Sequence, residues 1–187
     1  DGMTTTTRFP TIPQEQWTTE QRQFAAEITA GPRGQLRGPF VPLLYSPGLA
    51  SRVQQVGEYL RFNNRLPEPL VELAILVTAR RYNCVNIWQS HRIIARKCGL
   101  SPDIIAAIAQ ARTPDNLTRE ESAIYDFANE LGETISVGDA NFDRIVTIWD
   151  RSTAIDLIGV CGYYVMLAMV LNSARIPLPD GEPPFKP

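Results

Sequence analysis

One histidine and a glutamate upstream of it are the residues whose types and spacing best suit chemistry. His91 is the only histidine in the sequence, and Glu72 precedes it by 19 positions. An imidazole can gain and lose a proton near neutral pH, and a carboxylate beside it can orient the ring. Cys84 places a thiol two helical turns before the histidine. These three side chains are the candidate catalytic residues.

The residues around His91 have the spacing of one helical face. Positions 84, 88 and 91 are separated by four and three, so Cys84, Trp88 and His91 share a side of a helix. Ile87 lies close to the same side. We therefore expect Trp88 and Ile87 to form an apolar wall for a small substrate. A purely structural role, with a hydrogen-bonded histidine, an inert thiol and a core tryptophan, is the alternative.

Positive charge surrounds the histidine in the sequence. No Asp or Glu occurs between positions 73 and 102, whereas five cationic residues do: Arg80, Arg81, Arg92, Arg96 and Lys97. Because a guanidinium can bind a carboxylate through two hydrogen bonds, this bias favours a small anionic substrate held by Arg80 or Arg81. Exposed helix arginines are often merely solvated, and that alternative remains open.

Composition argues against several other classes of function. The formal net charge of −2 lacks the basic excess of a nucleic-acid-binding protein. The three cysteines, Cys84, Cys98 and Cys161, are widely spaced and favour neither a disulfide framework nor a metal site. The polar N-terminal residues do not resemble a secretory signal, so we expect a cytoplasmic protein. The uncharged run at residues 157–171 is shorter than the roughly 20 residues that a bilayer requires. It predicts a core or subunit-interface helix and no membrane partner.

The hydrophobic pattern predicts an all-α protein. Helical spacing recurs along the chain, with Thr18 or Thr19, Ser46-Pro47 and Thr118 as start signals and Gly99 as a stop signal. Residues 31–47 are rich in proline and glycine and predict a long connecting loop, a kind of segment that is often functional. The chain divides into a lead-in, helix and loop at 1–39, a helical domain at 40–175 and a proline-rich tail at 176–187.

The spaced residues resemble the signature of the carboxymuconolactone decarboxylase family, which also contains the alkyl hydroperoxidase D peroxidases. In the family a glutamate precedes the histidine by 19 residues, and in the decarboxylase-like branch a tryptophan lies three before it. Glu72, Trp88 and His91 match these positions, and Ala95 and Gly99-Leu100 match the residues that follow. The resemblance extends over roughly residues 40–181. It implies a single-domain helical bundle of the alkyl hydroperoxidase D-like type, no cofactor, and a homo-oligomer, commonly a trimer or hexamer.

The departures from the family pattern bear on function. The peroxidase branch carries Cys-x-x-Cys-x-x-x-His, in which one thiol attacks the peroxide and the second resolves it as a disulfide. Cys84 matches the first of these positions, but Ile87 occupies the second. Many decarboxylase-like members have a glutamate where Ile87 stands, so that carboxylate is absent too. Glu72 and His91 remain as the proton-transfer pair.

Three hypotheses follow from this comparison. The first is a cofactor-free lyase that decarboxylates a small carboxylated lactone or related ring compound by acid/base catalysis at His91. Glu72 would orient the imidazole of His91, and Arg80 or Arg81 would hold the substrate carboxylate. The second is a thiol peroxidase that uses Cys84 alone with an external thiol. The third is a non-catalytic oligomer that binds a small acid in the same pocket.

Overall fold

The computed structural model describes residues 7–178 and Phe185, and within them every regular element is a helix. This confirms the predicted all-α class. A 3-10 turn (Gln14–Gln16) precedes the α-helices, which are α1 (Thr19–Ala30), α2 (Phe40–Leu43), α3 (Pro47–Phe62), α4 (Glu68–Arg81), α5 (Val85–Lys97), α6 (Pro102–Ala109), α7 (Arg119–Thr134), α8 (Asp139–Ile148) and α9 (Arg151–Ala174). The proline-rich tail predicted at 176–187 falls largely outside the described residues, as do the first six residues of the lead-in.

Helix α4 is the centre of the fold. Every residue from position 70 to position 79 is buried, so this helix has no solvent-facing side over that stretch. It packs against α5, α6, α7 and α9. A helix that is apolar almost all round must lie inside a protein, and a polar residue on it needs an internal partner. Glu72 is such a residue, and it lies near the start of this buried stretch.

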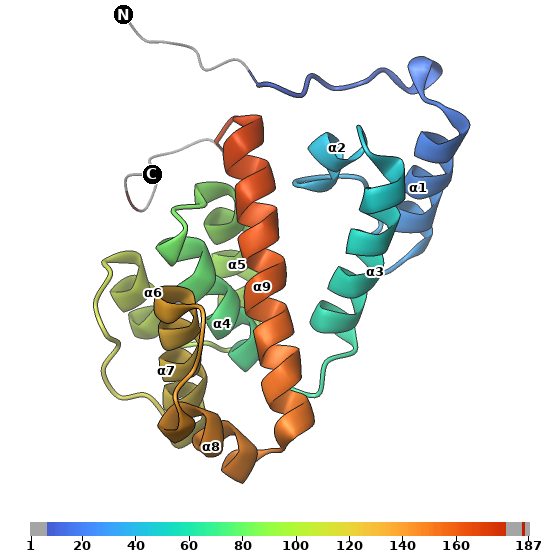
Figure 1. The fold of residues 1–187 in the computed structure, drawn as a ribbon. Coiled ribbons are helices and arrows are strands. Elements are labelled where there is room, and N and C mark those ends of the chain that lie inside the picture. The colour runs from blue at the N-terminus through green and yellow to red at the C-terminus, as the bar shows by residue number, and fades with distance from the viewer. Residues whose placement is uncertain (1–6, 179–184, 186–187) are drawn as a thin grey trace, which may run out of the picture.

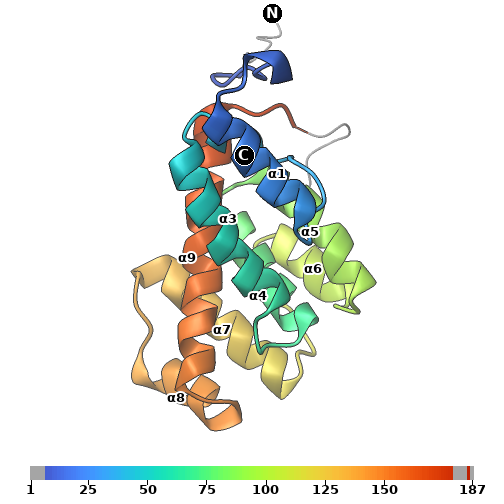
Figure 2. The ribbon, with the colours of Figure 1, turned by 90° about the vertical axis from the view of Figure 1, so that its right-hand side faces the viewer.

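Helix α9 runs along the length of the molecule between two groups of helices (Figure 1). On one side lie α1, α2 and α3, and on the other lie α4 to α8. Viewed from the first side, α1 and α3 lie next to each other, in agreement with their contacts (Figure 2). Helix α9 contacts members of both groups, among them α3, α4 and α7. It therefore joins the N-terminal helices to the bundle that carries Glu72 and His91.

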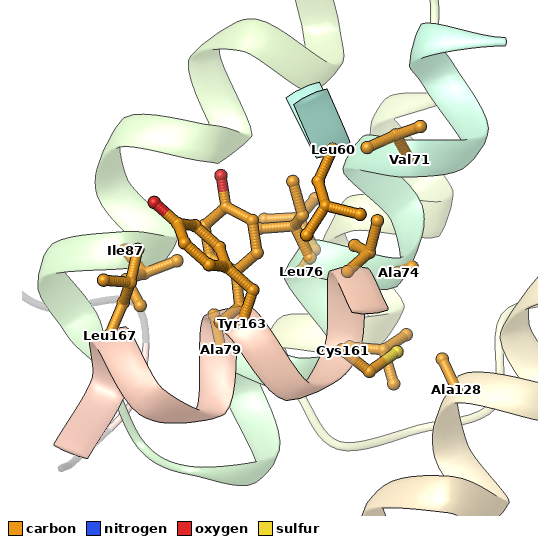
Figure 3. Close-up of a cluster of buried hydrophobic side chains, with 14 of the residues drawn as sticks. Leu60, Val71, Ala74, Leu76, Ala79, Ile87, Ala128, Cys161, Tyr163 and Leu167 are labelled. Atoms are coloured by element: carbon orange, nitrogen blue, oxygen red, sulfur yellow. The ribbon is translucent and has the colours of Figure 1, made fainter. Parts of the chain in front are cut away.

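The core at this junction is continuous. Figure 3 shows Leu60 of α3, Leu76 of α4 and Tyr163 of α9 in one buried cluster. By length and composition α9 is apolar enough to cross a membrane, but 56% of its most apolar window is buried inside the fold. The run at residues 157–171 thus supplies core side chains, as predicted.

Local sequence signals place most helix ends correctly. Thr18 and Thr118 each cap a helix by accepting a hydrogen bond from the backbone N–H three residues later, and the side chain of that later residue bonds back to the cap. Gly99 ends α5 with a positive φ of 100°, a conformation that glycine adopts without strain. Cys84 is the N-cap of α5, and Asn83 before it occupies the turn with a φ of 49°. Asparagine tolerates this left-handed conformation better than most residues.

One expectation about the N-terminal half needs correction. The segment at 31–47 is not wholly irregular, because the short helix α2 forms within it. On α3, apolar residues at helical spacing do not all face the core. Leu49, Val56 and Tyr59 are 50%, 52% and 45% exposed, whereas Val53 and Leu60 are buried. Periodicity identifies an apolar side but not the surface it meets.

Candidate active site

Glu72 and His91 form a buried pair. They lie on α4 and α5, consecutive helices that pack against each other. Oε2 of Glu72 lies 2.7 Å from Nδ1 of His91, and the side chains are only 3% and 9% exposed. The turn between the helices is closed by a hydrogen bond from the Cys84 N–H to the Ala79 carbonyl. Burial of a carboxylate is costly unless it is paired, so this contact accounts for Glu72 inside the core.

The pairing decides which nitrogen of His91 is available for chemistry. An ionised Glu72 accepts a hydrogen bond, so Nδ1 carries the proton that it donates. The second ring nitrogen, Nε2, is then the one that can serve a ligand. When neutral, Nε2 can accept a proton, and when protonated it can donate one. The imidazole is therefore held in a single orientation with one reactive nitrogen.

His91 also lines a cavity with a volume of about 520 Å³. The walls come from four parts of the chain: the segment 32–40, the C-terminal end of α3, helix α5 and helix α9. Ile87 is in the wall, as predicted, together with Ile94, Leu167 and Leu171. A volume of this size accommodates a small molecule, and its wall combines apolar side chains with polar and charged ones that could orient a ligand.

The charges around this cavity have one sign. Four cationic side chains line it, Arg33, Arg37, Arg61 and Lys97, and no residue of its lining is acidic. The wall therefore favours an anion, in line with the expectation drawn from the sequence. Three of the four cations lie outside the segment 73–102 on which that expectation was based. The residues that carry the charge were thus misidentified, although its sign was right.

Arg80 and Arg81 do not belong to this site. Arg80 donates hydrogen bonds to the Ala109 carbonyl and to Asn83, and its guanidinium lies over the ring of Phe185. Arg81 donates to Asn129 and forms an ion pair with Glu133. Both line a separate surface depression at the other end of α4. They lie at the C-terminal end of α4, about two turns beyond Glu72, and so cannot hold a ligand at His91.

Cys84 and Trp88 are buried beside the site without lining it. Cys84 is fully buried at the N-terminus of α5, and burial raises the pKa of its thiol. Trp88 is 1% exposed, and its indole packs edge-on against Phe185. The expected common face of Cys84, Trp88 and His91 exists along the helix, but α5 is rotated so that positions 87, 91 and 94 reach the cavity. Trp88 is therefore a core residue and not part of the ligand wall.

Tyr164 is a cavity residue that the sequence did not single out. Its ring lies edge-on to that of His91, with the ring centroids 4.9 Å apart. The side chain is buried, and burial raises the pKa of its hydroxyl, which therefore stays neutral. Among the described residues the hydroxyl has no hydrogen-bond partner, and Tyr164 borders the cavity. In the sequence it lies within the apolar run at 157–171, where a tyrosine is easily read as core.

Arg33 is the second residue that the sequence did not single out. Its guanidinium lies over the ring of Phe40 at 4.7 Å and over that of Phe62 at 5.9 Å. It donates a long hydrogen bond of 3.5 Å to the hydroxyl of Tyr163. The proline- and glycine-rich composition of residues 31–47 was the only signal for it, since that composition marked the segment as a functional loop.

The comparisons with known proteins agree with this fold. The model of the carboxymuconolactone decarboxylase family matches residues 47–130, which include Glu72, Cys84 and His91. The structure is similar to that of an alkylhydroperoxidase AhpD core, an uncharacterized peroxidase-related protein from Ralstonia eutropha JMP134, with a TM-score of 0.76 and 18% identity over 93% of each chain. No curated protein matches the chain.

At that level of identity the structural likeness shows a shared fold, and the family match adds the sequence relationship. The protein thus has the AhpD core fold, and the part of the chain that carries the Glu72–His91 pair matches the model of the carboxymuconolactone decarboxylase family.

Proposed function

We propose that the protein is a cofactor-free lyase that decarboxylates a small carboxylated lactone or related ring compound by proton transfer at His91. The observation that carries this proposal is the buried Glu72–His91 pair, whose histidine lines a cavity in which the formally charged side chains are all cationic. Decarboxylation breaks the bond between the ring carbon and the carboxylate, releases carbon dioxide and leaves the electron pair on that carbon. Conjugation moves the charge to a carbonyl oxygen as a dienolate. The site must stabilise that charge and then supply a proton.

His91 supplies the proton. In its protonated form it donates Nδ1–H to Glu72 and presents Nε2–H to the cavity, and transfer of the Nε2 proton to the ring carbon yields product and neutral histidine. Solvent then returns the proton to Nε2. Glu72 keeps the imidazole oriented and offsets the positive charge that it carries before transfer.

The dienolate oxygen needs a donor that does not itself lose a proton. The Tyr164 hydroxyl, neutral and beside His91, fits this role, because a preorganised donor in a dry site stabilises an oxyanion well. The positive charges of the cavity wall also stabilise the negative charge of the dienolate. A cofactor is not required for any of these steps.

The Cys84 peroxidase hypothesis is less well supported by the geometry. A peroxidatic cysteine needs a thiolate that a peroxide can reach, whereas Cys84 is fully buried, absent from the cavity lining and has a raised pKa. Ile87 also occupies the position of the resolving thiol. The third hypothesis, binding of a small acid without turnover, involves the same cavity. A decarboxylation assay distinguishes it from the first hypothesis.

The test is a decarboxylation assay with an α,β-unsaturated γ-lactone that bears a carboxylate on the saturated ring carbon next to the double bond. Released carbon dioxide is measured, and in deuterated water one deuterium should appear on a ring carbon of the former dienolate. His91→Ala should abolish both signals, while Arg52→Gln, a change on the exposed side of α3, should leave them intact. Turnover that survives His91→Ala would contradict the role of the histidine. Binding without turnover would favour the non-catalytic hypothesis.

A further inference from the structure

Arg33 differs from the other cations of the cavity in how it is held. Aromatic rings lie on its guanidinium from α2 and from the end of α3, through Phe40 and Phe62. The hydroxyl of Tyr163, a buried residue of α9, accepts a hydrogen bond from one terminal nitrogen, Nη2. Three elements that are far apart in the sequence therefore fix one side chain. Such fixation reduces the side-chain entropy that binding would otherwise cost.

A glycine makes this arrangement possible. A Cβ atom built at Gly57 of α3 would lie 2.0 Å from the hydroxyl oxygen of Tyr163 and 2.6 Å from Nη2 of Arg33. Both distances are shorter than van der Waals contact, so a side chain at position 57 would displace the pair. Glycine costs helix stability in a helix interior. Here its absence of a side chain admits the guanidinium to the space between α3 and α9.

The hydrogen bonding of Arg33 is incomplete. Its Nε atom is buried and has no partner among the described residues, and the single bond to Tyr163 is long. No acidic residue lines the cavity, and among the described residues Arg33 forms no ion pair, although the charge of Glu58 acts on it at longer range. A partly buried guanidinium with unused donors gains from an anion that completes its hydrogen bonding. Burial lowers the pKa of Arg33, but an arginine remains charged at neutral pH.

We propose that Arg33 is the carboxylate anchor of the cavity and determines its specificity for anionic over neutral ring compounds. This inference rests on the proposed function, because it takes the cavity to be the substrate-binding site. The flat guanidinium binds the two oxygens of the carboxylate, while Phe40 and Phe62 cover its faces. Because a tight grip on the departing carboxylate would stabilise the ground state, the anchored carboxylate is one that the reaction leaves in place. Tyr163 and Gly57 act through Arg33 as positioning residues.

The test uses His91 as a built-in reporter. Because it is the only histidine, untagged protein labelled with nitrogen-15 histidine gives ring signals from one residue of the cavity wall. The probe is 2-furoate, a five-membered ring with one carboxylate, and methyl 2-furoate is its neutral counterpart. Furoate should shift the His91 signals in a saturable way, and the ester should shift them much more weakly.

Variants identify the residue that binds. Arg33→Gln should weaken furoate binding by about tenfold or more, as expected for loss of hydrogen bonds to a charged partner. Arg33→Lys keeps the positive charge but lacks the paired N–H donors of the guanidinium, so it should recover only part of the affinity. Tyr163→Phe should weaken binding and leave the discrimination between acid and ester in place. Arg52→Gln, which changes an exposed arginine of α3 whose Nη1 donates to the Gly48 carbonyl, is the matched control and should bind as the unmodified protein does.

Three results would overturn the anchor. The first is equal affinity for furoate in Arg33→Gln and in the unmodified protein. The second is equal affinity of the unmodified protein for furoate and for its methyl ester, and the third is no shift of the His91 ring signals in a large excess of furoate. If Arg33→Gln does not fold, judged by thermal unfolding, Arg33→Lys and Tyr163→Phe decide the matter by the same comparison. Because this experiment requires no turnover, Arg33-dependent binding without decarboxylation refutes the proposed function alone. Decarboxylation with an unchanged KM in Arg33→Gln refutes the anchor alone.

Discussion

The ring of Tyr164 stands edge-on to the ring of His91, with the two planes at 83°. The contact joins α9 to α5 at the candidate site. Phenylalanine at position 164 would keep this packing and remove only the hydroxyl.

We expect Tyr164→Phe to lower kcat by about 10- to 100-fold, in the range typical of losing one oxyanion donor or somewhat less. Its melting temperature should change little, because among the described residues no hydrogen bond is lost. Steady-state kinetics and thermal unfolding measure the two effects. An unchanged kcat would show that the hydroxyl does not contact the developing oxyanion.

Glu72→Gln tests the orientation of the histidine. A glutamine amide can donate to Nδ1, which would place the proton of the neutral ring on Nε2 and remove the site that accepts a proton from solvent. By analogy with hydrolase triads, in which the same change costs about 10⁴ in kcat, we expect a loss of 10²-fold or more. The nitrogen-15 shifts of His91 would report the tautomer directly. Full activity in Glu72→Gln would show that the pair has only a structural role.

Cys84 should resist modification in the folded protein, whereas Cys98 should not. Burial raises the pKa of Cys84, and its side chain is inaccessible, whereas Cys98 is partly exposed. We expect iodoacetamide at neutral pH to label Cys98 first and Cys84 only after unfolding. Peroxide treatment followed by mass spectrometry should leave Cys84 as a thiol. Selective oxidation of Cys84 in the native protein would revive the peroxidase hypothesis.

Stability should fall in alkali because of Cys161. Burial raises its pKa from 9.0 to about 11. The unfolded chain therefore loses this proton first as pH rises, so the stabilising contribution is complete below pH 9 and is lost toward pH 11. Two pKa units correspond to about 2–3 kcal/mol.

The comparison is with Cys161→Ala, which should be less stable at pH 8 because it leaves a small cavity, but should lose less stability in alkali. Tyr163 and Cys84 also have raised pKa values and contribute alkaline sensitivity to both proteins. Denaturant unfolding at pH 8 to 11 measures the difference. A gap between the two proteins that does not narrow with pH would contradict the effect assigned to Cys161.

Self-association should involve the outer side of α9. Ile155, Ile158 and Met169 recur at helical spacing on that side and are 66%, 38% and 59% exposed. The exposed residues of α3, among them Val56, lie on the adjoining helix. We expect sedimentation to show a trimer or hexamer, which Ile158→Glu should dissociate, because a charge would be buried in an apolar contact.

Ile135→Glu is the matched control, since Ile135 is 79% exposed at the end of α7. It should leave the assembly intact. A monomer at all concentrations of the unmodified protein would contradict the expected oligomer, and an Ile158→Glu protein that remains assembled would place the interface elsewhere.

The sequence alone determined the helical class, several helix boundaries and the choice of Glu72 and His91 as candidate residues. The boundaries follow from local rules: Thr18 and Thr118 cap helices through neighbouring backbone groups, and Gly99 adopts a conformation that side chains disfavour. Glu72 and His91 were identifiable because His91 is the only histidine and the glutamate precedes it at the spacing of the family pattern.

Only the tertiary structure decided which residues surround them. Arg80 is close to His91 in the sequence but is turned away by its position along α4, whereas Arg33 reaches the cavity because the segment at 31–39 folds across α5 and α9. Helical periodicity likewise could not tell that Val56 is exposed and Val53 buried. Spacing fixes which side chains share a face, but the neighbour that covers a face is set by packing between distant segments, which no local pattern encodes.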